Sequence, residues 1–208
     1  MTNLADRVAP TPRRPLLATI PHQAGTRQWL GLGVISLVTL LISIDISVLG
    51  FALPMISETL KPSATQLLWI MDVYSFVLAG LLITMGWAGD RIGRRTLLII
   101  GAAVFGIASA GAAFSTTPTM LIACRILLGV GAATLTPTSL ALIRTMFREP
   151  AQRKTAIATW SGALTGGAAI GPIVGGLLLN NFSWGSVFLI NVPVMIAAVA
   201  LAPILLPE

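Results

Sequence analysis

The chain has 208 residues, of which 55% are hydrophobic and 10% charged, and its mean hydropathy is +0.89; this composition excludes a soluble globular domain and indicates an integral membrane protein. Its formal net charge of +6 is carried by short segments beside apolar runs rather than by one basic patch, which excludes a nucleic-acid partner. One cysteine, Cys124, and one histidine, His22, exclude an intramolecular disulfide and a His/Cys metal site in the membrane, so we expect no metal and no cofactor.

Residues 1–28 differ in composition from the rest of the chain. They contain Pro10, Pro12, Pro15 and Pro21 together with Arg7, Arg13, Arg14 and Arg27. Such a segment has too little apolar surface to offset the entropy that folding would cost. We expect a disordered cytoplasmic tail here.

Six apolar runs follow the tail. They cover residues of about 30–54, 67–88, 96–114, 119–143, 155–179 and 185–206. Each run is close to the ~20 residues that a helix needs to cross a hydrocarbon core of ~30 Å. We therefore expect residues 29–208 to form six membrane-spanning helices in a lipid bilayer, which makes the chain an all-α membrane protein.

The lysines and arginines fall on one side of the predicted spans. Eleven of the 13 lie in the tail, in the loop after the second run or in the loop after the fourth run. The opposite loops carry only Lys61, and Arg125 lies within a span. Because basic residues accumulate on the cytoplasmic side, we expect a multi-pass protein of the cell (inner or plasma) membrane with both termini in the cytoplasm.

The first run contains a carboxylate, Asp45, in an otherwise apolar stretch that continues to Pro54. An ionisable residue inside a membrane span is energetically costly, and it indicates a functional site by default. We therefore expect Asp45 to take part in the activity of the protein.

The second run contains a second carboxylate, which lies between aromatic residues. At helical spacing Trp69, Asp72 and Phe76 share one face, and Tyr74 is close by in sequence. A lipophilic cation can lie against aromatic faces while a carboxylate balances its charge, so we expect these four residues to bind a cationic substrate. Alternatively, Trp69 and Tyr74 belong to the aromatic belt at the membrane interface, but a belt does not account for Asp72.

A charged segment separates the second run from the third. It contains Gly86, Asp90, Arg91, Gly93, Arg94 and Arg95. Four charges so close together cannot lie in hydrocarbon, so both neighbouring spans must leave the membrane here. We expect Asp90 to anchor the helix ends around it, while the arginines pair with Asp90 or with a neighbouring acid. A loop selected only for positive charge would not require Gly86, Asp90 and Gly93.

The fourth run contains an arginine, Arg125, which is followed by Gly129 and Gly131. A dinucleotide-binding loop would need a preceding strand and a third glycine, so nucleotide binding is excluded. At about 1.5 Å per residue, Arg125 and Asp45 lie at depths that agree within the error of the predicted span ends.

The fifth run is rich in glycine, and the sixth contains an amide. The fifth run includes Gly162, Gly166, Gly171, Pro172, Gly175 and Gly176. Small residues at this spacing allow two helices to pack closely, and Pro172 removes one backbone hydrogen bond and allows a bend. Asn191 in the sixth run could bond either a neighbouring helix or its own backbone.

These stretches resemble motifs of the major facilitator superfamily. The segment from Gly86 to Arg95 resembles the loop between the second and third spans of that family, and Arg125 with its glycines resembles the fourth-span motif. The glycines with Pro172 resemble the fifth-span motif typical of proton-coupled exporters. The stretches around Asp45 and Asp72 resemble the fourteen-span drug:proton antiporter branch of quaternary-ammonium and multidrug efflux type. Gly50 stands where that branch usually has asparagine.

The resemblance implies a particular fold. It is a six-helix transmembrane bundle of two inverted three-helix repeats, which is the N-terminal half of a major facilitator fold. A C-terminal half bundle, missing from this chain, would complete the central cavity. We therefore expect the N-terminal fragment of a longer exporter or a half that needs a partner, and a self-sufficient six-span protein is the alternative.

The resemblance also implies a function, namely proton-coupled export of lipophilic cationic drugs. By this resemblance Asp45 is the proton-coupling acid with Arg125 as its partner, while Asp72 holds the charge of the drug. Burial penalises a charged carboxylate and a nearby cation favours it, and this balance lets a carboxyl group take up and release protons. A facilitator or importer of a small metabolite in the same fold is the alternative. We expect no enzyme, because an intramembrane serine protease needs a base near its nucleophile and the spans contain no histidine or lysine.

Overall fold

The computed structural model describes residues 23–208, and this part of the chain is all-helical. Its helices are α1 (Thr26–Leu60), α2 (Ala64–Ile92), α3 (Arg94–Ala113), α4 (Pro118–Met146), α5 (Pro150–Asn181), α6 (Ser186–Leu189) and α7 (Asn191–Leu205). The expected tail lies largely outside the described residues. Its last three residues are helical, because α1 begins at Thr26 rather than near residue 30.

Six helical segments are long and apolar enough to cross a membrane, which confirms the expected all-α membrane fold. The sixth segment, Ser186–Leu205, is interrupted at Ile190, where α6 gives way to α7. Pro193 explains the interruption, because it has no N–H to donate to the carbonyl of Leu189. Several helices extend beyond the predicted runs, since a helix continues into polar sequence until a cap or a turn ends it.

Local sequence signals set several of these helix ends. Ser63 caps α2 by accepting a hydrogen bond from the backbone N–H of Gln66 at 3.3 Å. Glu149 caps α5 by accepting from two backbone N–H groups, and proline is the next residue. Gly93 alone separates α2 from α3, with a φ of 105° that favours glycine. The sharp turn between the two helices therefore explains why a glycine stands at position 93 of the charged segment.

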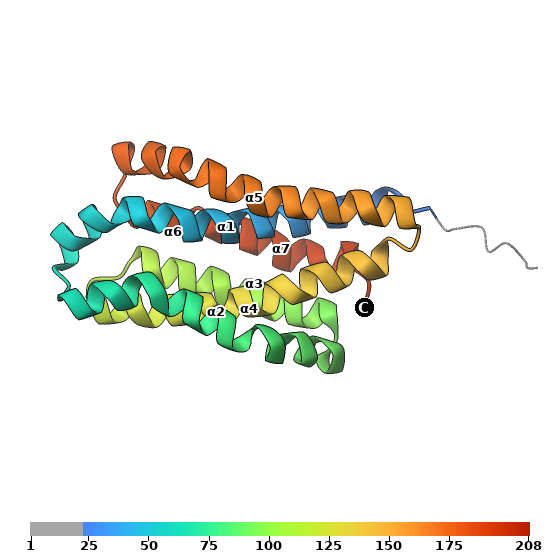
Figure 1. Ribbon diagram of the computed structural model, residues 1–208, viewed down its shortest axis with the longest axis horizontal. Helices are drawn as coiled ribbons and strands as arrows, with labels where there is room; N and C mark the ends of the chain where they lie inside the picture. Colours follow the sequence, from blue (N-terminus) through green and yellow to red (C-terminus); the bar gives the residue numbers. More distant parts are fainter. Residues whose placement is uncertain (1–22) are drawn as a thin grey trace, which may run out of the picture.

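The spans pair across the two halves of the chain (Figure 1). Helix α1 packs along α5, α2 packs along α4, and α3 lies between α4 and α7. The first three spans therefore interlock with the last three. The α2–α3 turn, the α4–α5 loop, the start of α1 and the end of the chain lie at one end of the bundle, which we call the Arg-rich end. Its basic residues are Arg27, Arg91, Arg94, Arg95, Arg144, Arg148, Arg153 and Lys154.

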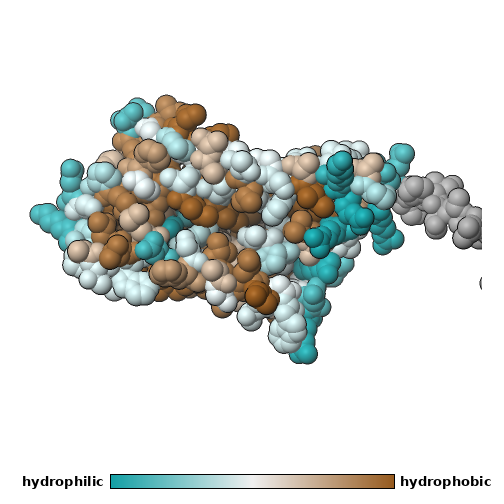
Figure 2. Space-filling model, viewed as in Figure 1, coloured by the Kyte–Doolittle hydropathy of each residue, from teal (hydrophilic) through white to brown (hydrophobic). Residues whose placement is uncertain are grey.

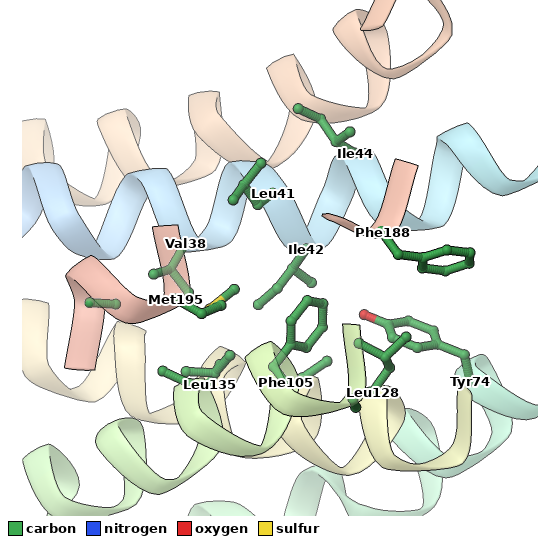
Figure 3. Packing of buried hydrophobic residues seen from close by; sticks show 14 of the residues in the cluster. Val38, Leu41, Ile42, Ile44, Tyr74, Phe105, Leu128, Leu135, Phe188 and Met195 are labelled. Carbon is green, nitrogen blue, oxygen red and sulfur yellow. The ribbon is translucent and has the colours of Figure 1, made fainter. Parts of the chain in front are cut away.

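The interior of the bundle is filled by apolar side chains from several helices (Figure 3). Ile42, Phe105, Leu128 and Leu135 are almost completely buried and meet there. Hydrophobic residues also cover much of the outer surface between more hydrophilic ends (Figure 2). Helices α1 and α4 are mostly buried, whereas α2 and α5 are mostly exposed. Asp45 and Arg125 are the charged side chains among the buried residues, and they indicate the candidate site.

Candidate functional site

A buried ion pair lies in the middle of the bundle. Arg125 on α4 donates from Nη1 to Oδ2 of Asp45 on α1 at 2.8 Å. Each residue is only 1% exposed. The contact follows the expected partnership of these two residues. Removing one partner of such a pair leaves an uncompensated buried charge and typically costs about 3–5 kcal/mol.

Arg125 is also held by α2. Its Nε donates to the backbone carbonyl of Ile70 at 3.2 Å, and its guanidinium lies 4.6 Å from the centre of the Tyr74 ring. Cation–π contacts of this kind stabilise a desolvated arginine. Arg125 therefore keeps two partners on α2 in addition to Asp45.

Tyr74 does not belong to the expected cation-binding face. It is completely buried, and its side chain is directed into the bundle (Figure 3). Two residues along a helix turn the side chain by about 200°, so Tyr74 points away from the face of Asp72. Within this bundle Tyr74 contacts Arg125, and its contact with a substrate stays a prediction.

A buried amide completes the coordination of Asp45. Asn191, the first residue of α7, donates from Nδ2 to Oδ1 of Asp45 at 3.1 Å and to Oγ of Ser109 on α3 at 3.2 Å. Asn191 and Ser109 are completely buried. The amide therefore bonds neighbouring helices, which the sequence had left open. Ser109 was not predicted, and the only signal for it was a hydroxyl group within an apolar span.

These contacts bring five helices together at one carboxylate. Asp45 accepts from Arg125 on one oxygen and from Asn191 on the other, so its charged form is well satisfied. Ser109 extends the network to α3, and Arg125 extends it to α2. We call these groups the Asp45 network. A change of charge at Asp45 would alter the hydrogen bonds that join α1, α2, α3, α4 and α7.

Asp72 lies apart from this network, on the exposed face of α2. Trp69 is 48% exposed and Phe76 is 64% exposed, and Asp72 between them is also exposed. No ion pair of Asp72 occurs within residues 23–208. The expected grouping of an acid between two aromatic side chains is thus present on a face that the described helices leave uncovered.

The charged segment joins α2, α3 and α4. Arg94 pairs with Asp90 at 3.0 Å and donates to the carbonyl of Ala141 and the hydroxyl of Thr145 on α4. Arg95 pairs with Glu208, as expected of an arginine beside a neighbouring acid. Arg91 instead lies over the ring of Trp87, 4.3 Å from its centre. Of the three arginines, Arg94 is therefore the one that ties Asp90 to α4.

The glycines of α5 lie on two faces. A Cβ atom added at Gly171 or Gly175 would collide with Ser47 or Val48 of α1, as expected for a close helix–helix contact. Gly162, Gly166 and Gly176 have open space instead, and Pro172 is exposed. Gly167, which was not predicted, comes closest of these glycines to the backbone of α1, because its Cβ would lie 2.5 Å from the backbone oxygen of Leu40. Close packing on α1 therefore explains only part of the motif.

The sequence is similar to known transporters over most of its length. Residues 35–208 match the profile of the Major Facilitator Superfamily. The chain is 53% identical over 183 residues to the multidrug efflux pump LfrA of Mycolicibacterium smegmatis, covering 88% of this chain and 36% of LfrA. It is 49% identical over 182 residues to the methyl viologen resistance protein SmvA of Salmonella typhimurium, covering 88% of this chain and 37% of SmvA.

The fold is also similar to a solved transporter. A bacterial homologue of the human lysosomal transporter Spinster, crystallised in an inward-facing and unoccupied conformation, superposes with a TM-score of 0.68 at 20% identity. The match covers 88% of this chain and 43% of that chain. The chain thus spans little more than a third of the two curated relatives and less than half of this structure.

Proposed function

The chain belongs to the major facilitator superfamily, and from that premise we propose that its whole protein exports lipophilic cations in exchange for protons. The family and the fold are those of transporters rather than enzymes. Two relatives are a multidrug efflux pump and a methyl viologen resistance protein. Methyl viologen is a flat, aromatic dication, so the chemistry of this compound agrees with the proposed class of substrate.

The exposed face of α2 is the observation that carries the proposal. Asp72 stands there between Trp69 and Phe76, and all three side chains are exposed. Aromatic faces attract a desolvated cation, and a carboxylate balances its charge. In the proposed transporter this face lines a central cavity that a second six-helix bundle completes, and the substrate lies against it.

Proton coupling is assigned to Asp45 within the same proposal. A proton bound to Asp45 would remove the negative charge that faces Arg125. The partners of Arg125 on α2 would remain, so the contact that weakens is the one between α1 and α4. Uptake and release of a proton would in this way alter how two spans are held together.

The proposed orientation places the Arg-rich end in the cytoplasm. Among the described residues outside the spans, the opposite end carries a single basic residue, Lys61. Basic loops are retained on the cytoplasmic side during insertion. Both termini of the chain are therefore placed in the cytoplasm, in a multi-pass protein of the cell membrane.

A transport assay on the whole protein, as its gene encodes it, tests the proposal. We expect proteoliposomes with an imposed pH gradient to move ethidium and methyl viologen against their concentration gradients. Sugar uptake without movement of either cation would overturn the proposal, because it would support a facilitator or importer.

The variant Asp72→Asn tests the cation-binding face. It should raise the KM for methyl viologen by about tenfold or more, which corresponds to roughly 1.4 kcal/mol of lost attraction, and it should affect a monocation less. Glu58→Gln is the matched control, since Glu58 is an exposed carboxylate near the far end of α1. Equal effects of the two variants would remove Asp72 from the binding site.

A further inference from the structure

Asn191 is held at only one end of its amide group. Nδ2 contacts both partners, Asp45 and Ser109, whereas Oδ1 is buried and has no donor among the described residues. A buried acceptor without a partner costs about 1–3 kcal/mol, so an amide used only to join helices would be a poor choice here. No hydrogen bond at the far end opposes a half-turn of the amide about its Cβ–Cγ bond.

Both partners of Asn191 can reverse their hydrogen-bonding role. A carboxylate accepts only, but a protonated carboxyl group also donates through its O–H. The Ser109 hydroxyl can donate as well as accept, since its proton rotates. After a half-turn, Oδ1 of Asn191 would occupy the place of Nδ2 and accept from both groups. Two hydrogen bonds are present before the half-turn and two are present after it.

We propose that Asn191 is a positioning residue that serves Asp45 in both protonation states, donating to the carboxylate and accepting from the carboxylic acid after an amide half-turn. The inference rests on the proposed proton coupling at Asp45 and names the residue that accommodates the proton. The proton comes from the aqueous phase and binds Oδ1 of Asp45, and no other covalent bond changes. The amide has one end without a partner in either orientation, namely the Oδ1 acceptor before the half-turn and the Nδ2 donors after it.

The other groups around Asp45 do not replace Asn191 in this role. Arg125 on α4 is a donor only, and it bonds the other carboxylate oxygen. Tyr74 on α2 contacts Arg125 through its ring, and its hydroxyl has no partner among the described residues. Helix α5 meets α1 through glycines, and α6 contributes apolar residues such as Phe188 to the core. Asn191 is the group at Asp45 that offers both a donor and an acceptor on one rotatable end.

Isotope-edited infrared spectroscopy of the whole protein tests the inference. The protein is labelled with ¹³C-asparagine, and acid-minus-base difference spectra are recorded. We expect a carboxylic C=O band that is lost in Asp45→Asn, together with a shift of a labelled side-chain amide C=O band. The amide shift should be lost in Asn191→Leu, which has a similar shape without polar atoms. It should persist in Asn181→Leu, the matched control at an exposed amide.

The outcomes separate the inference from the proposed function. A carboxylic band that depends on Asp45, without any shift of an amide band, overturns the inference alone, because Asn191 would then be only a donor. Failure to find such a carboxylic band overturns both. If Asn191→Leu does not fold, Ser109→Ala replaces it as the test variant. It removes one of the two hydrogen-bond partners of the Asn191 amide, so the size of the amide shift should change. An unchanged shift would contradict the half-turn.

Discussion

At the scale of single residues, Asp45 and Arg125 are the charged groups that lie buried in the described chain. Both carboxylate oxygens of Asp45 accept hydrogen bonds from buried donors on other helices. A buried polar network is energetically costly when some of its hydrogen bonds are missing. Helix arrangements that break these bonds are therefore unfavourable, and the network stabilises the one arrangement in which they form. A group that can lose its charge inside this network can release that arrangement, which is the physical basis of the role proposed for it.

The variant Asp45→Asn tests this role. Asparagine cannot take up a proton in place of the carboxylate, so we expect pH-driven export of every substrate to stop. The variant also leaves Arg125 without its counter-charge, which should lower the free energy of unfolding by about 3–5 kcal/mol. Export would be measured in proteoliposomes, and stability by thermal unfolding in detergent.

A double variant separates the loss of coupling from the loss of stability. In Asp45→Asn with Arg125→Met, no buried charge remains unpaired, so stability should recover towards that of the parent. Export should remain absent. Recovery of pH-driven export in the double variant would show that the ion pair only aids folding.

At the scale of helices, the seam between α1 and α5 is a close contact that depends on glycine. Gly167, Gly171 and Gly175 are spaced at four residues and bring α5 against the backbone and the small side chains of α1. Ser43 on α1 donates to the carbonyl of Leu164 on α5 at 2.6 Å, which also requires a short distance between the helices. In a bilayer such packing, rather than the hydrophobic effect, supplies much of the attraction between spans.

Two adjacent glycines provide a sharp test of this seam. Gly167→Ala places a methyl group against the backbone oxygen of Leu40, whereas Gly166→Ala places one in open space. We expect Gly167→Ala to lower the free energy of unfolding by about 1–3 kcal/mol, as overpacking does, and Gly166→Ala to leave it nearly unchanged. Equal melting temperatures for the two variants in detergent would contradict the seam as described.

At the scale of the whole molecule, the Asp45 network and the Arg-rich end lie at different levels of the same helices. The network joins α1, α2, α3, α4 and α7 in the interior, and Arg94 joins α3 to α2 and α4 at the end. In the proposed transporter these end contacts close the cytoplasmic side in the outward-facing state and must loosen during each cycle. Transport should then depend on Arg94 although this residue lies far from the cation-binding face.

The variant Arg94→Gln tests that dependence. It removes the link from Asp90 to Thr145, and we expect the rate of export to fall by about fivefold or more, as a coupling free energy of about 1 kcal/mol implies. Arg91→Gln is the matched control, because it removes the same charge from the same segment, and Arg91 lies over the Trp87 ring without an ion pair among residues 23–208. The amount of inserted protein should be normal for both. Similar export by the two variants would count against Arg94 as the link.

The sequence alone determined the number of spans, the all-helical fold and the residues most worth testing. Runs of apolar residues and the distribution of arginines are local properties, and the bilayer acts on them locally. Asp45 and Arg125 could be singled out in the same way, since any ionisable residue inside a span is exceptional. Counting residues along the two helices also indicated that Asp45 and Arg125 lie at similar depths in the membrane.

Only the tertiary structure decided which face of each helix points inward. Tyr74 was grouped with Asp72 although it lies on the buried side of α2, Ser109 and Gly167 were not singled out, and the partner of Asn191 was left open. In a soluble protein the polar side of a helix identifies its outer face, but these helices are apolar on all sides because lipid replaces water around them. The hydrophobic pattern therefore does not indicate how each helix is oriented. Arg125 was expected as a partner of Asp45 from the sequence, but the contact with Asn191 became known only from the packed helices.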